Sequence, residues 1–192
     1  MPRVPPIPSK AARCFAALSL AALATFAHAQ TEDTASSDAK ASAAQSQKLS
    51  TADQQFIQDA GTAGATEIAA SKLALTRSSD RQVKEFAQRM IEDHAKLARN
   101  LDVIAKRHGI TSPPSADSSV TGSLQNLQGA EFDKAYIEKV ALAAHQKAVE
   151  LFGKESEKGN DAALKAAAAK ALPILRHHYA MAQQLPHAKA GS

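Results

Sequence analysis

The chain has 192 residues, a net charge of +4, one cysteine and no tryptophan. Aromatic residues make up only 4% of it, so few side chains are available to stack on nucleic-acid bases. Residues 1–29 contain three lysines or arginines, no acidic residue and the only cysteine, Cys14, so this segment carries +3 of the net charge of +4. These features argue against a nucleic-acid partner and, if residues 1–29 are removed, against disulfides and thiolate metal sites.

Residues 1–29 have the pattern of a secretory signal peptide. The first residues include three that are basic, Arg3, Lys10 and Arg13. They precede an apolar run, residues 14–26, that is too short to cross a bilayer. An A-x-A cleavage site ends at Ala29, which predicts a mature chain starting at Gln30 and without a transmembrane span. The alternative, an uncleaved anchor helix, fits the short apolar run less well. We therefore expect a periplasmic or secreted protein.

The first part of the mature chain separates into a polar leader and a helix. Residues 30–50 contain one large apolar residue, Leu49, and are expected to form a disordered tether. An amphipathic helix is predicted over residues 51–76. One face of this helix consists of alanine and glycine, including Gly61 and Gly64, which predicts close packing against a neighbouring helix.

The second predicted helix, residues 79–108, has the strongest pattern in the chain. Its inward-facing residues recur at steps of three and four: Val83, Phe86, Met90, His94, Leu97, Leu101, Ile104 and His108. Ser79 and Gln82 fit a capping box at its start, and Gly109 fits a helix end. The two-residue link from the first helix, residues 77–78, predicts an antiparallel hairpin.

The second half of the chain contains a long connection and two further helices. Residues 110–128 are rich in serine, proline and glycine, with a short helical turn expected near Leu124, and are long enough for a ferritin-type crossover. Helices are predicted over residues 130–158 and 161–185, followed by a tail, 186–192. Residues 51–185 are therefore expected to form an all-α, antiparallel four-helix bundle, in which the sequence leaves open a crossover or an up-down-up-down order.

Each predicted helix carries one metal-ligating residue type on or beside its core face: Glu67, His94, His145 and His178. Counted from the turns, all four lie near the middle of the bundle, within roughly one to two helical turns of each other. Three imidazoles and a carboxylate suit one divalent zinc, iron, copper or nickel ion. Glu92 and Asp93 are expected on a solvated flank. The alternative is that the histidines are packed core residues without a metal.

Four segments of the chain resemble a known family. These are residues 67–74, the run VKEFAQRMIEDH at 83–94, the run GAEFDKAYI at 129–137 together with His145, and LPIL at 172–175 together with His178. Over residues 51–185 the chain resembles the secreted bacterial "domain of unknown function 4142" family. This resemblance implies a ferritin-like fold, export and, for some members, association with the outer membrane, but no settled activity. Glu67, Asp93, His94, His145 and His178 match polar positions that recur in the family.

The sequence departs from the pattern of ferritin-type di-iron proteins. Those proteins place E-x-x-H on two helices, whereas Ile91 and Leu175 stand three residues before His94 and His178. Ferroxidase or iron-storage activity is therefore not expected, and the family's frequent aspartate before the third-helix histidine is replaced by Ala144. The leading hypothesis is a non-catalytic binding or structural protein of the cell envelope, with an envelope protein or a second copy as partner and a role in stress tolerance. The alternative is a mononuclear metal-binding bundle.

Overall fold

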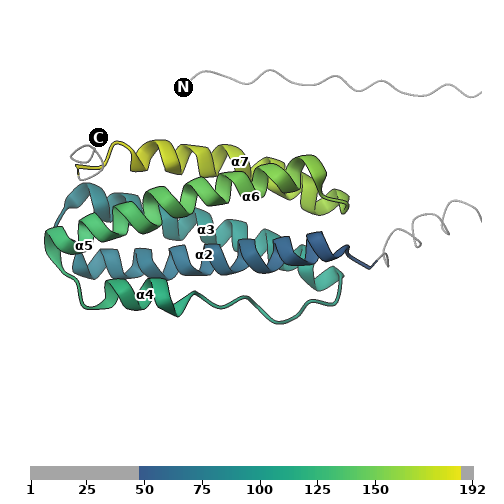
Figure 1. Ribbon diagram of the computed structural model, residues 1–192, viewed down its shortest axis with the longest axis horizontal. Helices are drawn as coiled ribbons and strands as arrows, with labels where there is room; N and C mark the ends of the chain where they lie inside the picture. Colours follow the sequence, from purple (N-terminus) through teal and green to yellow (C-terminus); the bar gives the residue numbers. More distant parts are fainter. Residues whose placement is uncertain (1–47, 187–192) are drawn as a thin grey trace, which may run out of the picture.

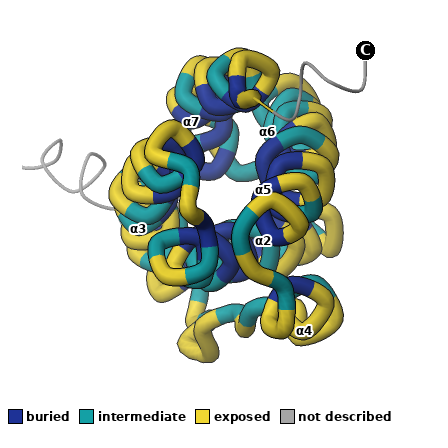
Figure 2. Tube along the Cα trace, turned by 90° about the vertical axis from the view of Figure 1, so that its left-hand side faces the viewer, coloured by how far each residue is buried: buried dark blue, intermediate teal, exposed yellow. Residues whose placement is uncertain are grey.

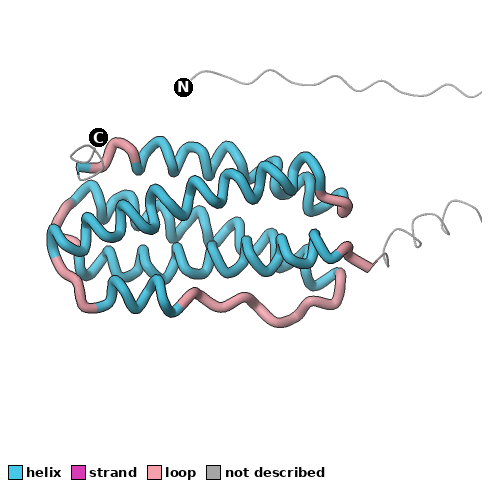
Figure 3. The backbone as a smooth tube through the Cα atoms, in the orientation of Figure 1, coloured by secondary structure: helices cyan, strands magenta, loops and turns pink. Residues whose placement is uncertain are grey.

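The computed structural model describes residues 48–186, which form an all-helical bundle (Figure 3). Its elements are α2 (Thr51–Arg77), α3 (Arg81–Arg107), α4 (Ser118–Gln125), α5 (Gly129–Tyr136), η1 (Ile137–Ala144), α6 (His145–Lys158) and α7 (Ala162–Ala182). The segments α5, η1 and α6 follow one another without a break and make one long rod, in which η1 is a π-helix. The predicted four-helix bundle is thus confirmed, with α2, α3, the rod and α7 as its members.

The long connection between α3 and α5 returns the chain to the end at which α3 began (Figure 1). α2 and α3 run antiparallel, and the rod runs antiparallel to α7, but α3 and the rod run in the same direction. One lengthwise crossover is the ferritin-type order, so the structure selects this topology over an up-down-up-down order. The short α4 lies within the crossover, near the helical turn predicted around Leu124.

Viewed along its axis, the bundle is a ring of four rods whose buried residues face inward (Figure 2). α2 packs mainly on α3 and α6 mainly on α7, while α3 also contacts α7 and α2 also contacts α6. The core at the α2–α3 turn contains Phe86, Met90, Phe132 and Tyr136. A second apolar cluster at the opposite end contains Phe56, Ile57, Ile104 and Leu164. The histidines lie between these two clusters along the sequence of each helix.

Side-chain caps fix where the helices begin. Asp80 caps α3 by accepting hydrogen bonds from the backbone N–H groups of Gln82 and Val83, at 2.7 and 3.0 Å. The predicted capping box centred on Ser79 is therefore wrong by one residue, since Asp80 is the stronger acceptor and Ser78 closes α2. Asp161 caps α7 through the N–H of Leu164.

Several predicted segments lie outside the described residues, namely the signal peptide, most of the tether (30–47) and most of the tail (187–192). At the edge of the described part, Leu49 is buried in the second apolar cluster, and Ser50 caps α2 by accepting from the N–H of Asp53. Residues 49–50 thus belong to the folded domain rather than to the tether. Within the described residues, no helix is both long and apolar enough to cross a membrane.

The small-residue face of α2 packs on α3, as predicted, and makes two further contacts. Gly61 faces Pro114 of the crossover so closely that a Cβ atom at position 61 would collide with the proline ring. Ala60, Ala63 and Gly64 also line a cleft between the rods. The small side chains therefore admit a connection on one flank and leave space on the other.

Candidate metal centre

The four candidate residues come together in the interior of the bundle, one from each rod. His94 lies on α3, His145 opens α6 and His178 lies on α7, while Glu67 lies on α2. All four are buried, with at most 3% of each residue exposed. Each lies on the inward face of its helix together with buried residues three or four positions away, such as Ala70, Met90 and Leu175.

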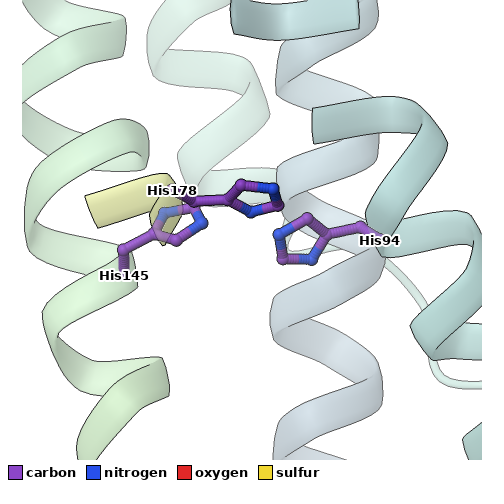
Figure 4. Close-up of side chains that lie close together, drawn as sticks. All are labelled: His94, His145 and His178. Atoms are coloured by element: carbon purple, nitrogen blue, oxygen red, sulfur yellow. The ribbon is translucent and has the colours of Figure 1, made fainter. Parts of the chain in front are cut away.

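The three imidazole rings surround a common space (Figure 4). One ring nitrogen of each histidine lies within 4.8 Å of one from each of the others. The ring centroids of the three pairs are 5.3 to 5.5 Å apart, so each ring neighbours both of the others. His94, His145 and His178 are therefore a single cluster rather than three separate core residues.

One ring nitrogen of each histidine contacts an oxygen atom of the protein. His145 Nδ1 donates to the backbone carbonyl of Val140 at 3.1 Å, because a carbonyl can only accept. His178 Nε2 lies 3.1 Å from Asp93 Oδ2, and His94 Nδ1 lies 2.9 Å from Glu67 Oε2. Ionised carboxylates also only accept, so these two nitrogens are the protonated ones.

The second nitrogen of each ring is buried and has no hydrogen-bond partner. These atoms are His94 Nε2, His145 Nε2 and His178 Nδ1. In a neutral imidazole whose other nitrogen donates, this second nitrogen carries the lone pair that binds a metal. Three buried ring nitrogens without a hydrogen-bond partner are unfavourable. A metal ion held by the three histidines would supply partners for ring nitrogens of this cluster, so the residues present fit a metal centre.

The spacing of the cluster is close to that of a bound ion. Nitrogens on one zinc ion, at bonds of about 2.1 Å in tetrahedral geometry, are roughly 3.4 Å apart. The ring nitrogens of the cluster lie within 4.8 Å of one another, so the rings must move closer together to bind an ion. Three protein ligands also leave a fourth position open, as in zinc sites that bind a further ligand.

Glu67 contacts the cluster at its edge. Its Oε2 accepts from His94, and its Oε1 lies 3.7 Å from His145 Nδ1 without a hydrogen bond. Burial raises the pKa of Glu67, but electrostatic attraction and a hydrogen bond from His94, with smaller contributions from His145 and His178, hold that pKa below its usual value. The predicted ligand Glu67 is therefore placed to orient His94, and the set whose ligand atoms converge consists of the three histidines alone.

The environment keeps two of the histidines neutral, which is the form that binds a metal. Burial lowers the pKa of His145, with Glu67 acting in the opposite direction. Burial also lowers the pKa of His178 to about 4, and His94 and His145 lower it further, whereas the hydrogen bond that His178 donates to Asp93 acts in the opposite direction. Both rings are consequently uncharged at neutral pH.

Asp93 is the functional residue that the helical pattern misplaced. It was expected on a solvated flank, but its Oδ2 holds His178 across the α3–α7 contact, while Oδ1 binds Lys96 at 3.2 Å. Its side chain is 25% exposed, which is why a pattern of buried residues does not single it out. The only early signal was its place among the recurring polar positions of the resembled family.

The π-helix η1 was also not foreseen, since residues 130–158 were expected to form a regular helix. It ends directly before His145 and brings the carbonyl of Val140 to His145 Nδ1. Single π-helical turns within α-helices are frequent at functional sites. Here the π-helix fixes the orientation of one ring of the histidine cluster.

Comparison with known protein families identifies the family of this chain. The family model described as "Domain of unknown function (DUF4142)" matches residues 38–185. The chain belongs to this family. The DUF4142 match begins ahead of the helical bundle and includes all four candidate residues. No curated protein matches the chain.

Among solved structures, the DUF4142 chain is similar to the crystal structure of a DUF305 fragment from Deinococcus radiodurans. The TM-score is 0.62 at 16% sequence identity, covering 72% of this chain and 97% of the other. At this identity the similarity supports the helical fold alone. The resemblance to DUF4142 is thus confirmed, and the fold has an experimental counterpart.

Proposed function

We propose that this protein is exported to the cell envelope and binds one divalent transition-metal ion through His94, His145 and His178. The observation that carries the proposal is the set of three buried ring nitrogens without hydrogen-bond partners in one cluster of histidines. Glu67, Asp93 and the carbonyl of Val140 each hold the opposite nitrogen of one ring. Metal-binding histidines usually have such partners, which fix the tautomer and raise the basicity of the ligand.

The donor set restricts the class of metal. Three neutral imidazoles without thiolate favour zinc, copper, nickel or iron over calcium or magnesium, which prefer oxygen ligands. The Irving–Williams order then predicts that copper(II) binds most tightly among the divalent ions and iron(II) least tightly. Because two carboxylates hold the rings, the centre as a whole balances the charge of a divalent ion.

The direct test is the metal content of the chain purified from the periplasm without a tag or chelator. We expect one equivalent of a transition metal by elemental analysis, or one equivalent taken up on adding copper or zinc. The His178→Ala variant should lose this binding. Its matched control is His177→Ala, which removes the exposed neighbouring imidazole and should leave the stoichiometry unchanged.

A protein without metal on purification, and without a thermal shift on adding copper, zinc, nickel or iron, would contradict the metal proposal. Equal loss of binding in the two variants would also contradict it, because His177 lies outside the cluster. In either case the second candidate function gains support. That candidate is a binding or structural envelope protein in which the three histidines are core residues, and the observation that favours it is the burial of all three side chains.

Export is the second element of the proposal, and it rests on the sequence of residues 1–29. The A-x-A site at Ala27–Ala29 supports cleavage before Gln30 and a periplasmic or secreted mature chain. Cell fractionation followed by N-terminal sequencing tests it, with Gln30 as the expected first residue. An Ala29→Arg change should block cleavage and leave a larger form, whereas Ala24→Ser, inside the apolar run, should be processed normally.

A further inference from the structure

Beside the histidine cluster, the bundle contains an apolar cleft of about 510 Å³. All four rods contribute to its walls, and the exposed lining residues lie on α3 and α7, so the cleft opens between these two neighbouring rods. It runs along α3 from Leu97 to Arg107, which is about 15 Å at the rise of an α-helix. Its volume lies in the range of small-molecule sites in proteins, roughly 300–1,000 Å³.

Small side chains keep this cleft open. On α7 the wall includes Ala163, Ala167 and Ala171, and on α2 it includes Ala60 and Gly64. Larger residues at these positions would fill the interior, as leucine and phenylalanine do in the two core clusters. Protein interiors are normally packed without voids of this size, so a cleft held open by residues from two helices is a feature of a binding site.

The chemistry of the cleft differs between its mouth and its inner end. At the mouth lie two cationic side chains, Arg107 and Lys170, together with Val103, which is 50% exposed. Val103 is the only large apolar side chain that is exposed among residues 48–186. The one acidic lining residue is Glu67, which is buried at the inner end and paired with His94.

From this distribution we infer that the cleft binds a single-chain aliphatic carboxylate, a fatty acid of medium length. The alkyl chain lies between α3 and α7 against the alanine-rich wall, and the carboxylate lies at the mouth near Arg107 and Lys170. The opposite orientation is disfavoured because it places the carboxylate beside the buried carboxylate of Glu67. The chain also covers Val103, which is otherwise in contact with solvent.

His94 and Glu67 also line the inner end of the cleft, but the inference does not require a bound metal, so the two proposals are tested separately. The probe is dodecanoate, titrated calorimetrically into the chain purified from the periplasm and delipidated, in the metal-free and the metal-loaded form. We expect saturable one-to-one binding of equal strength in both forms. Dodecyltrimethylammonium, with the same chain and a cationic head, and acetate, with the same head and no chain, should each bind at least tenfold more weakly.

Two pairs of variants locate the ligand. Ala167→Phe places a large ring in the cleft and should weaken dodecanoate at least tenfold, while Ala169→Phe, an exposed position on the same helix, should not. Arg107→Gln with Lys170→Gln should weaken binding several-fold. The matched pair Arg99→Gln with Lys147→Gln removes two exposed charges that lie outside the cleft and should have no effect.

Several outcomes would overturn the inference. Absence of saturable binding, or equal binding by Ala167→Phe and wild type, would show that the cleft is not the site. Binding of the cationic amphiphile as tightly as dodecanoate would exclude recognition of an anion. Binding seen only with metal would place the carboxylate on the metal rather than at the mouth. Concentration-dependent dimerisation abolished by Ala167→Phe would identify a second copy of the chain as the occupant.

Discussion

Asp93 Oδ2 and His178 Nε2 lie 3.1 Å apart, and this contact joins α3 to α7 at the level of the histidine cluster. The carboxylate fixes the proton on Nε2 and thereby leaves the lone pair of His178 on Nδ1. It also stops the ring from rotating away from His94 and His145. Asp93 is therefore a positioning residue for the proposed centre, and its pKa is held below the usual value because the hydrogen bonds of His178 and Lys96 outweigh the effect of burial.

This contact predicts a specific weakening of metal binding. Asp93→Ala should lower the affinity for copper or zinc by roughly 10–100-fold, the usual effect of removing such a partner, while one equivalent still binds at saturation. Glu92→Ala removes the neighbouring exposed carboxylate and should leave affinity within about twofold. Competition titration against a chromophoric chelator measures both. Equal metal affinity of Asp93→Ala and wild type would contradict the positioning role of Asp93.

The helices and the depth of the site could be predicted because both depend on periodicity. Inward residues at steps of three and four fixed α3, and counting from the turns brought His94, His145 and His178 to one level. An amphipathic pattern does not show which neighbour a half-exposed side chain contacts. Asp93 adjoins His94 in sequence and was misplaced for this reason.

Neither the π-helix nor the cleft could be predicted from the sequence, and the physical reason differs between them. A π-helix needs one hydrogen-bond register to shift, and the run from Ile137 to Ala144 contains no residue type that signals it. Small residues on α2 permit either close packing or open space, and only the position of the neighbouring helices decides between them. Gly61 packs closely against Pro114, whereas Gly64 lines the open cleft.

A buried hydroxyl pair near the α2–α3 turn predicts a loss of stability. Tyr136 Oη and Ser71 Oγ lie 2.8 Å apart, and both residues are fully buried. Tyr136→Phe removes one partner and leaves the serine hydroxyl without it, so the free energy of unfolding should fall by about 1–2 kcal/mol. Tyr179→Phe, on the partly exposed Tyr179, should change it by less than about 0.5 kcal/mol. Urea denaturation compares the two, and equal effects would contradict the assignment.

A pair of buried carboxyl groups at the opposite end predicts a pH-dependent effect. Burial, followed by the negative charges of Asp53 and Asp161, raises the pKa of Glu155 to about 7. A raised pKa means that the contribution of Glu155 to stability is complete below its ordinary pKa of about 4.3 and is lost as the pH rises through about 7. Both Asp53 and Glu155 have a buried carboxylate oxygen without a hydrogen-bond partner.

The substitution Glu155→Gln isolates this effect, because glutamine is neutral at every pH. The difference in melting temperature between the variant and wild type should move in favour of the variant by a few degrees between pH 5 and pH 8, as a change of about 1 kcal/mol produces. Taking the difference cancels the other groups that titrate in this window. Glu157→Gln, an exposed neighbour, should give a difference that does not vary with pH. A flat difference for Glu155→Gln as well would show that Glu155 is ionised throughout.

Two glycines within helices predict opposite responses to the same change. A Cβ at Gly61 would collide with Pro114, whereas a Cβ at Gly153 of α6 would meet no atom within 4 Å. Alanine is favoured over glycine inside a helix by about 0.8–1.0 kcal/mol, so Gly153→Ala should stabilise the protein by up to that amount. Gly61→Ala should instead lower the free energy of unfolding by about 1–3 kcal/mol, because the crossover must move away from α2.

The double variant Gly61→Ala with Pro114→Ala distinguishes a local collision from a general intolerance of α2 to substitution. If the proline ring is what position 61 meets, shortening it should restore most of the stability lost by Gly61→Ala, and the two changes should not be additive. Chemical denaturation of the four proteins gives the coupling energy, which we expect to exceed about 0.5 kcal/mol. Additive effects would mean that the crossover does not rest on α2 at this position. The crossover is what returns the chain to the start of α5, so this contact between Gly61 and Pro114 tests the topology of the bundle as well as its packing.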